Sequence, residues 1–311
     1  MAGRPIFVAT HPRSCSTAFE RVFMTRPDDI SCAHEPFGDA FYFGPERLSA
    51  RFADEPKLRE ESGFTKTTYK DVLDSLLKQD KRLFIKDMAY YLFAPQGQPT
   101  SMAPSLADQA NGVDKQTGDR AANPTTIPLS ALQKFRFAFL IRNPRRSIPS
   151  YYRCTVPPLV ETTKFNEFMP CEAGYKELRR LFDYLRAQGL VADDDITIID
   201  ADDLLDRPAE GIEAFCKAVD LDFRPEMLQW DDSAHQDHAT AAFEKWAGWH
   251  NDALASTGLK ARTSHKKTPS ADEEDAEWAS KYGAKGQKII RDCVDTNMPD
   301  YDYLKQFTLK F

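Results

Sequence analysis

The chain has 311 residues, of which 41% are hydrophobic and 29% are charged, values typical of a globular protein. A formal net charge of −7 argues against a nucleic-acid binder, and no run approaches the ~20 apolar residues of a membrane span. Six scattered cysteines without a CxxC pair argue for free thiols, and against a zinc site or a disulfide frame. The start MAGRPIF predicts a strand and no secretory signal, so we expect a cytoplasmic protein. The length suits one α/β domain over residues 1–311.

The first informative segment is IFVATHPRSCSTAFER, residues 6–21. Its apolar start predicts a strand, and the helical spacing that follows Ser16 predicts a helix after a tight turn. Such a turn aims free backbone N–H groups at a phosphate, and the helix dipole attracts negative charge. The Walker string GxxxxGK[ST] is absent from the sequence, so Arg13 would be the cation, beside the hydroxyl groups of Ser16 and Thr17. The alternative is an N-capped helix after an ordinary strand.

The next elements continue an alternation of helix and strand. The spacing of DVLDSLLK, residues 71–78, predicts a helix, and RLFIKDMAYYLF, residues 82–93, begins as a strand. Residues 94–128 then contain five prolines, three glycines and many small polar residues. This composition predicts a flexible insertion or a lid.

A second motif is FAFLIRNPRRSIPSYYR, residues 137–153. Its apolar start predicts a buried strand that ends at Arg142, and Asn143 can cap a helix whose first residue is Pro144. Ser150 lies eight residues after Arg142, so its hydroxyl can face the same region. Pro149 falls inside this helix, where we expect it to delete a hydrogen bond and kink the axis.

The last part of the chain becomes helical. Strand and helix patterns alternate up to residue 219, which predicts a mostly parallel sheet, and only helical patterns follow in a C-terminal subregion over 222–311. The remaining predicted elements are a helix over 172–188, a strand over 196–200, and helices over 208–219, 235–258 and 272–296.

The two motifs resemble those of the sulfotransferase family, which uses 3′-phosphoadenosine 5′-phosphosulfate (PAPS) as donor. Arg13 takes the basic position of the family's loop for the 5′-phosphosulfate, and Ser16 and Thr17 take its hydroxyl positions. Arg142 and Ser150 match the family's 3′-phosphate site in residue type and spacing.

The resemblance extends over residues 5–220, and HEPFGDAFYFGPER, residues 34–47, is similar to sulfotransferase-like proteins of filamentous fungi. It implies a three-layer P-loop-type fold with a mostly parallel central sheet flanked by helices. The chain departs from the family at Cys15, where a glycine is usual, and in lacking an Arg-Lys-Gly segment, of which KYGAKGQK at 281–288 is a weak echo. The donor-binding residues that the resemblance implies are His11, Arg13, Ser14, Cys15, Ser16, Thr17, Arg142 and Ser150.

Sulfuryl transfer needs a cation and N–H donors at the leaving phosphate and a base at the acceptor, and it needs no metal. Arg13 and the loop amides would serve the phosphate. Glu35 follows an expected second strand, and the resemblance supports it as the base. His34 could act instead, since only one of the two can face inward if the strand persists, and a solvated loop carboxylate is the plain alternative. Lys86 could reach the bridging phosphate oxygen with Asp87 orienting it, or the two could form a strand-end ion pair.

Several other side chains leave alternatives open. Because the donor is highly anionic, it needs a local basic patch, for which the chain offers Arg13, Lys86, Arg142, Arg145 and Arg146. The C-terminal part carries a group of aromatic residues, Trp230, Trp246, Trp249 and His250. This group could pack in the core, line an acceptor pocket or stack on the adenine of the donor. A second polar group consists of Asp231, Asp232, His235, Asp237 and His238. We expect an exposed polar turn there rather than a metal site, because the spacing does not match a known set of metal ligands.

Three functions therefore compete. The first is a PAPS-dependent sulfotransferase of secondary metabolism that acts on a small hydroxylated metabolite, with no nucleic-acid or membrane partner. The second is a protein of the same fold that carries out other chemistry in the same pocket. The third is a non-catalytic nucleotide-binding protein. A homodimer stays open as the oligomeric state.

Overall fold

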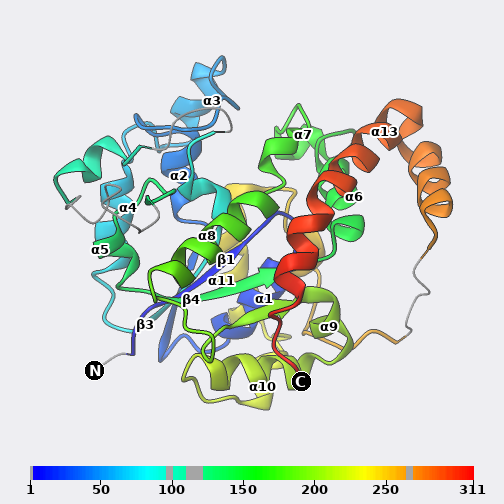
Figure 1. Ribbon diagram of the computed structural model, residues 1–311. Coiled ribbons are helices and arrows are strands. Elements are labelled where there is room, and N and C mark those ends of the chain that lie inside the picture. The colour runs from blue at the N-terminus through cyan, green and yellow to red at the C-terminus, as the bar shows by residue number, and fades with distance from the viewer. Residues whose placement is uncertain (1–2, 96–100, 110–121, 264–268) are drawn as a thin grey trace. The chain divides into compact units, whose positions relative to one another are not determined.

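The computed structural model describes residues 3–95, 101–109, 122–263 and 269–311 (Figure 1). Its backbone divides into two compact units, which we describe separately. The first unit comprises Met1–His11, Arg26–Phe139 and Lys176–Thr197, and the second comprises Pro12–Thr25, Leu140–Tyr175 and Ile198–Phe311. The expectation of one domain over 1–311 stays a prediction.

The predicted α/β architecture with a parallel sheet is confirmed. β1 (Ile6–Thr10) pairs in parallel with β3 (Arg82–Met88) and with β4 (Arg136–Ile141), and β2 (Ile30–His34) pairs in parallel with β3. The short β5 (Ile198–Asp200) completes the order β2-β3-β1-β4-β5. β1 is buried throughout, and β3 and β4 are buried after their first residues. This burial explains their continuous apolar sequences, which are typical of parallel strands covered on both faces.

Helices flank the sheet strands of the first unit. Phe7 of β1 forms the centre of an aromatic core, with ring centroids 6.4 Å from Phe37, 5.7 Å from Phe135 and 5.2 Å from Phe137. The helix predicted over 71–78 begins slightly earlier, because Thr68 and Asp71 form a capping box. The helices of this unit are α2 (Phe37–Tyr42), α3 (Pro56–Glu61), α4 (Tyr69–Leu76), η1 (Ala89–Leu92), η2 (Pro104–Gln109), α5 (Leu129–Leu132) and α8 (Tyr175–Ala187).

The described ends of the predicted insertion over 94–128 are packed into the first unit. The backbone N–H of Ala103 donates to the carbonyl of Thr126 at 3.0 Å, and the N–H of Thr126 donates to the carbonyl of Leu92 at 2.9 Å. Leu106 is fully buried. Residues 96–100 and 110–121 lie outside the described residues, so the flexible insertion or lid stays a prediction.

The second unit is mostly helical. Phe215 of α10 packs its ring edge against Phe19 at 4.9 Å and against Phe23 at 5.4 Å, which joins α10 to α1. In Figure 1, α13 (orange to red) runs beside α6 (green), and both belong to this unit. Its helices are α1 (Ser16–Met24), α6 (Pro144–Cys154), α7 (Val160–Thr163), η3 (Pro170–Glu172), α9 (Ala201–Asp206), α10 (Pro208–Ala218), η4 (Pro225–Leu228), α11 (Ser233–Phe243), η5 (Glu244–Trp246), α12 (Asn251–Leu254) and α13 (Ala271–Lys305).

Two glycines change the predicted C-terminal helices. The helix expected over 235–258 is divided into α11, η5 and α12, with Gly248 at φ +84° between the last two. The prediction of one continuous helix there is wrong, because this left-handed backbone interrupts helical hydrogen bonding. The helix expected over 272–296 exists and is longer, but Gly283 at φ 72°, ψ 171° kinks it. Arg291 beyond the kink donates to Asp275 before it at 2.9 Å, so the two segments of α13 contact each other.

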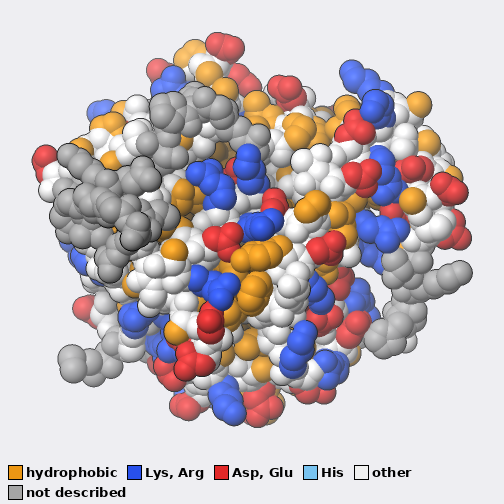
Figure 2. Space-filling model, in the orientation of Figure 1, with side chains coloured by type: hydrophobic (Ala, Val, Ile, Leu, Met, Phe, Trp, Pro, Cys, Tyr) orange, Lys and Arg blue, Asp and Glu red, His pale blue; other side chains and the backbone are white. Residues whose placement is uncertain are grey.

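No helix in the described ranges is both long and apolar enough to cross a bilayer. On the face drawn in Figure 2, acidic and basic side chains are interspersed among polar and hydrophobic ones.

Candidate functional site

The turn that follows β1 has an unusual backbone. Arg13 and Cys15 adopt φ values of 61° and 63°, in the left-handed region that glycine favours. Cys15 is the N-cap residue of α1, and it offers no side-chain cap. The alternative of an ordinary serine-capped helix is therefore wrong. The first amides of α1 are left without the side-chain acceptor that a capped helix would have.

The two sequence motifs meet in the second unit. Arg13 Nε donates a hydrogen bond to Ser150 Oγ at 2.9 Å, although 137 positions separate the two residues in the chain. Arg142 Nη1 donates to the carbonyl of Arg13 at 3.0 Å. The Arg13 guanidinium also donates to the carbonyl of Trp249 and lies 3.5 Å from the carboxylate of Asp252. The turn after β1 and the helix after β4 thus form one polar site.

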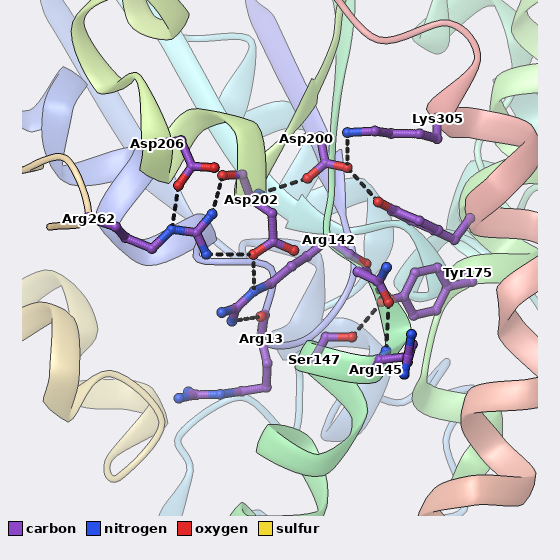
Figure 3. Close-up of polar contacts among 12 residues, drawn as sticks. Arg13, Arg142, Arg145, Ser147, Tyr175, Asp200, Asp202, Asp206, Arg262 and Lys305 are labelled. Atoms are coloured by element: carbon purple, nitrogen blue, oxygen red, sulfur yellow. Dashed lines mark hydrogen bonds and ion pairs between the residues drawn. The ribbon is translucent and has the colours of Figure 1, made fainter. Parts of the chain in front are cut away.

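Arg142 is held by a network that Figure 3 shows. Its Nε lies 3.8 Å from Asp202 Oδ1, and Arg262 donates to the same carboxylate at 3.2 Å and to Asp206 at 2.7 Å. Tyr175 Oη donates to the carbonyl of Arg142 at 2.6 Å. These contacts fix the chain where it leaves β4, so the arginine side chain has a defined position.

Local capping positions the helices on which this network depends. Asn143 Oδ1 accepts from the N–H of Arg145 at 2.9 Å, which confirms the predicted cap of α6. Asp200 Oδ1 accepts from the N–H of Asp202 at 2.7 Å and caps α9. Burial raises the pKa of the Asp200 carboxyl group, while Lys305 Nζ at 2.8 Å opposes that shift. Figure 3 shows Lys305 reaching this carboxylate.

Arg145 contributes to packing in this structure. Its Nε donates to Glu274 Oε2 at 2.9 Å, and its Nη2 donates to the carbonyl of Pro269 at 2.6 Å. Glu274 is buried and also accepts from Arg291 Nη2 at 3.1 Å. The guanidinium of Arg145 is therefore engaged by α13, and its predicted place in a donor patch is not supported by its contacts.

Thr17 has a partner that the sequence did not indicate. Thr17 Oγ1 lies 2.8 Å from His250 Nδ1, and the His250 ring is nearly buried against Phe243. The sequence grouped His250 with three tryptophans as an aromatic cluster. Of these, Trp230 and Trp246 are buried, in line with the core interpretation.

The predicted base lies in the first unit, directly after β2. Glu35 has φ 46°, and its N–H donates to the carbonyl of Lys86 at 2.8 Å. Glu35 Oε1 accepts from Lys86 Nζ at 2.5 Å, and Oε2 accepts from Tyr91 Oη at 3.3 Å. His34 Nε2 lies 3.8 Å from Glu35 Oε1. The strand ends at His34 and Glu35 is left-handed, so the expectation that only one of the two can face inward does not apply, and both side chains are buried.

Asp87 and Tyr91 support this arrangement. Asp87 Oδ2 accepts from the N–H of Phe37 at 2.9 Å, which fixes the start of α2 two residues after Glu35. Asp87 Oδ1 accepts from the N–H of Met88 at 2.9 Å. Burial raises the pKa of the Tyr91 phenol well above its usual value, so Tyr91 stays a neutral donor. Sequence reasoning missed Tyr91, which lies in an apolar aromatic run without a polar signal.

The remaining predicted site residues lie in the buried turn before α1 or near the start of α11. His11 and Ser14 are buried, and Ser16 begins α1. Asp232 caps α11 by accepting from the N–H of His235 at 2.8 Å. The expected polar turn is therefore the capped start of a helix, because His235, Asp237 and His238 lie inside α11.

Comparison with known proteins decides the family. Residues 5–225 match the description "Sulfotransferase family". The chain belongs to the sulfotransferase family. This sulfotransferase family enzyme is 23% identical over 250 residues to "Sulfotransferase ppzF" of Metarhizium majus, covering 76% of this chain and 73% of that protein. The expected likeness to fungal sulfotransferases is thereby confirmed.

The enzyme is also similar to a further protein and to a solved structure. It is 25% identical over 258 residues to "Branched-chain-amino-acid aminotransferase-like protein 2" of Arabidopsis thaliana, covering 83% of this chain and 36% of that protein. Among solved structures, the "Sulfotransferase Domain from the Curacin Biosynthetic Pathway" aligns over 90% of this chain and 97% of its own, with 16% identity and a TM-score of 0.44.

Proposed function

We propose that this enzyme transfers a sulfuryl group from PAPS to a hydroxyl or amine group of a small metabolite. The observation that carries the proposal is the meeting of Arg13, Ser150 and Arg142, through hydrogen bonds of 2.9 and 3.0 Å. Two arginines and a serine beside an uncapped helix N-terminus suit a ligand with two phosphate groups. Family membership supports PAPS as that ligand.

The donor would be held by residues of the second unit. Ser16, Thr17 and the first amides of α1 would bind the 5′-phosphosulfate, with Arg13 as the cation. Arg142 and Ser150 would bind the 3′-phosphate. The hydrogen bond between Arg13 and Ser150 would then be exchanged for bonds from both side chains to phosphate oxygens, in which the acceptor also carries charge.

Glu35 would act on the acceptor in the first unit. As the acceptor oxygen or nitrogen bonds to sulfur, the bond from sulfur to the 5′-phosphate oxygen breaks and the acceptor proton passes to Glu35. The products are the sulfated acceptor and adenosine 3′,5′-bisphosphate (PAP). Lys86 and Tyr91 would orient the carboxylate through the bonds described above, and His34 is the alternative base.

A direct assay tests the proposal. Purified enzyme is incubated with PAPS and a panel of small phenols, alcohols and amines, and both PAP and the sulfated product are measured by mass spectrometry. We expect equal amounts of the two for at least one acceptor, with EDTA present. Binding of PAP without transfer to any acceptor would favour other chemistry in the same fold.

A further inference from the structure

Three residues around the start of α1 contact one distant segment. Arg13 lies in the turn before α1, and Thr17 and Arg21 lie four residues apart on one face of the helix. We call them the α1 stripe. All three bond to residues 249–256, which we call the clamp segment.

Arg21 holds the far end of the clamp segment. Its guanidinium donates to the carbonyls of Ala253 at 2.6 Å and Ser256 at 3.3 Å, and to Gln236 Oε1 at 2.8 Å. Only 1% of Arg21 is exposed, and burial lowers its pKa. Carbonyls at the end of α12 suit a cation because of the helix dipole. A buried guanidinium is tolerated only while hydrogen bonds compensate for its lost hydration, so these bonds from Arg21 tie the clamp segment to α1.

Arg13 and Thr17 hold the near end, where the clamp segment reaches the donor turn. Arg13 donates to the carbonyl of Trp249, and Thr17 Oγ1 lies 2.8 Å from His250 Nδ1. The His250 ring is only 6% exposed and lies 5.2 Å from the ring of Phe243. The imidazole therefore cannot turn away from Thr17 without repacking its neighbours.

The contact between Thr17 and His250 determines whether the Thr17 hydroxyl can donate to a ligand. A threonine hydroxyl has one proton to donate and two lone pairs to accept with. When His250 carries its proton on Nδ1, the imidazole donates to Thr17 Oγ1, and the threonine proton is left for another acceptor. When Nδ1 lacks a proton, Thr17 donates to His250 and has none left to give. An anionic oxygen in front of Thr17 selects the first arrangement.

We propose that His250 is a positioning residue of the donor site. Its Nδ1–H fixes the Thr17 hydroxyl so that Thr17 donates to an oxygen of the donor's 5′-phosphate, and the clamp segment forms a wall of that site. This inference rests on the proposed function, because it takes Thr17 as a ligand of the 5′-phosphate.

The test uses two variants of His250 in the full chain. His250→Phe keeps a ring against Phe243 and removes the donor, whereas His250→Asn keeps an amide N–H near the position of Nδ1. Dissociation constants are measured by calorimetry for PAP and for adenosine 3′-phosphate, which lacks the 5′-phosphate. Thr17→Val and the double variant complete a cycle.

We expect His250→Phe to weaken PAP binding about tenfold, the size of a typical net hydrogen bond, and His250→Asn to restore most of that loss. Binding of adenosine 3′-phosphate should change less than twofold, and the double variant should bind PAP no more weakly than Thr17→Val. Equal losses for both nucleotides, or additive losses in the cycle, would overturn the positioning role. Folded wild-type protein that does not bind PAP would instead overturn the proposed function.

If His250→Phe lowers the thermal unfolding midpoint strongly, His250→Leu, which also lacks the donor, is measured beside His250→Asn. PAP affinity that falls in His250→Leu but not in His250→Asn supports the role of the N–H group, and unchanged affinity in both variants contradicts it. An intact fold with weakened binding of both nucleotides contradicts it.

Discussion

The Nε of Arg13 and the Oγ of Ser150 are joined by a 2.9 Å hydrogen bond across 137 positions of the chain. Arg13 belongs to a turn at the start of α1, and Ser150 lies inside α6. A hydroxyl and a guanidinium that meet in this way form a preorganised site for an anion, because both can donate to its oxygens. This contact connects the two phosphate motifs on which the proposed function depends.

The first prediction concerns the 3′-phosphate. Arg142→Ala should remove a charge-assisted contact worth roughly 1.5–3 kcal/mol, so that PAP and adenosine 5′-phosphate bind with nearly equal affinity. Calorimetric titration with each nucleotide measures the difference. Arg179→Ala, which removes an arginine of α8 that pairs with Asp183, is the control and should keep the discrimination. If Arg142→Ala weakens both nucleotides equally, the 3′-phosphate lies elsewhere.

The second prediction concerns the base. Glu35→Gln keeps the size and polarity of the side chain but cannot accept a proton at neutral pH. Turnover should fall about 10²–10⁴-fold, the usual contribution of a positioned base, while PAP affinity stays within a factor of two. Tyr91→Phe, which removes only the 3.3 Å bond to Glu35, should cost far less. A larger loss from His34→Ala than from Glu35→Gln would transfer the role to His34.

The third prediction concerns Cys15. Burial raises the pKa of its thiol, with Arg142 and Arg13 opposing the shift, whereas Cys171 is exposed. Because the thiolate is the reactive form, iodoacetamide at pH 8 should label Cys171 much faster than Cys15, as read from peptide masses. PAP should slow Cys15 further. Equal rates at the two cysteines would contradict the desolvated position of this thiol.

The raised pKa of the Cys15 thiol also predicts how the free energy of unfolding changes with pH. The folded state holds the proton more tightly, so this contribution is present below the thiol's ordinary pKa and is lost as the pH rises through the folded value. Above about pH 8.5, wild type should therefore lose stability relative to Cys15→Ser. Urea unfolding at pH 7 and pH 9.5 measures this difference, and a wild type that gains stability relative to the variant would refute it.

The fourth prediction concerns the core of the second unit. Phe215→Ala should lower the free energy of unfolding by about 3–5 kcal/mol, because the ring is fully buried between Phe19 and Phe23. Urea unfolding followed by circular dichroism measures the change. Glu213→Ala on the exposed face of the same helix should cost less than about 1 kcal/mol. A similar effect from both variants would mean that α10 is not packed as described.

Much of the fold followed from local sequence signals. Apolar runs predicted β1, β3 and β4, since parallel strands are buried on both faces. The cap at Asn143 and the start of α6 at Pro144 depend on neighbouring residues only, so the sequence also predicts them. The spacing of Arg142 and Ser150 indicated that both would face one region, and their shared contact with Arg13 agrees with that expectation.

The parts that sequence could not give depend on long-range contacts or on single backbone angles. The bond between Thr17 and His250 spans 233 positions, and no local pattern specifies such a partner. In a continuing strand the side chains of His34 and Glu35 would face opposite sides of the sheet. The left-handed φ of Glu35 interrupts this alternation, and no local pattern predicts such a backbone angle. Likewise, Gly283 kinks a segment whose periodicity is helical on both sides.

Binding of PAP without metal tests the central claim most directly. Thermal unfolding is followed in EDTA at increasing PAP, with adenosine as the control that lacks both phosphates. Each tenfold excess of PAP over its dissociation constant should add about 1.4 kcal/mol to the stability of the folded enzyme, and adenosine should add little. An unfolding midpoint that does not move at millimolar PAP would contradict the account, because the site formed by Arg13, Ser150 and Arg142 would then not bind the donor nucleotide.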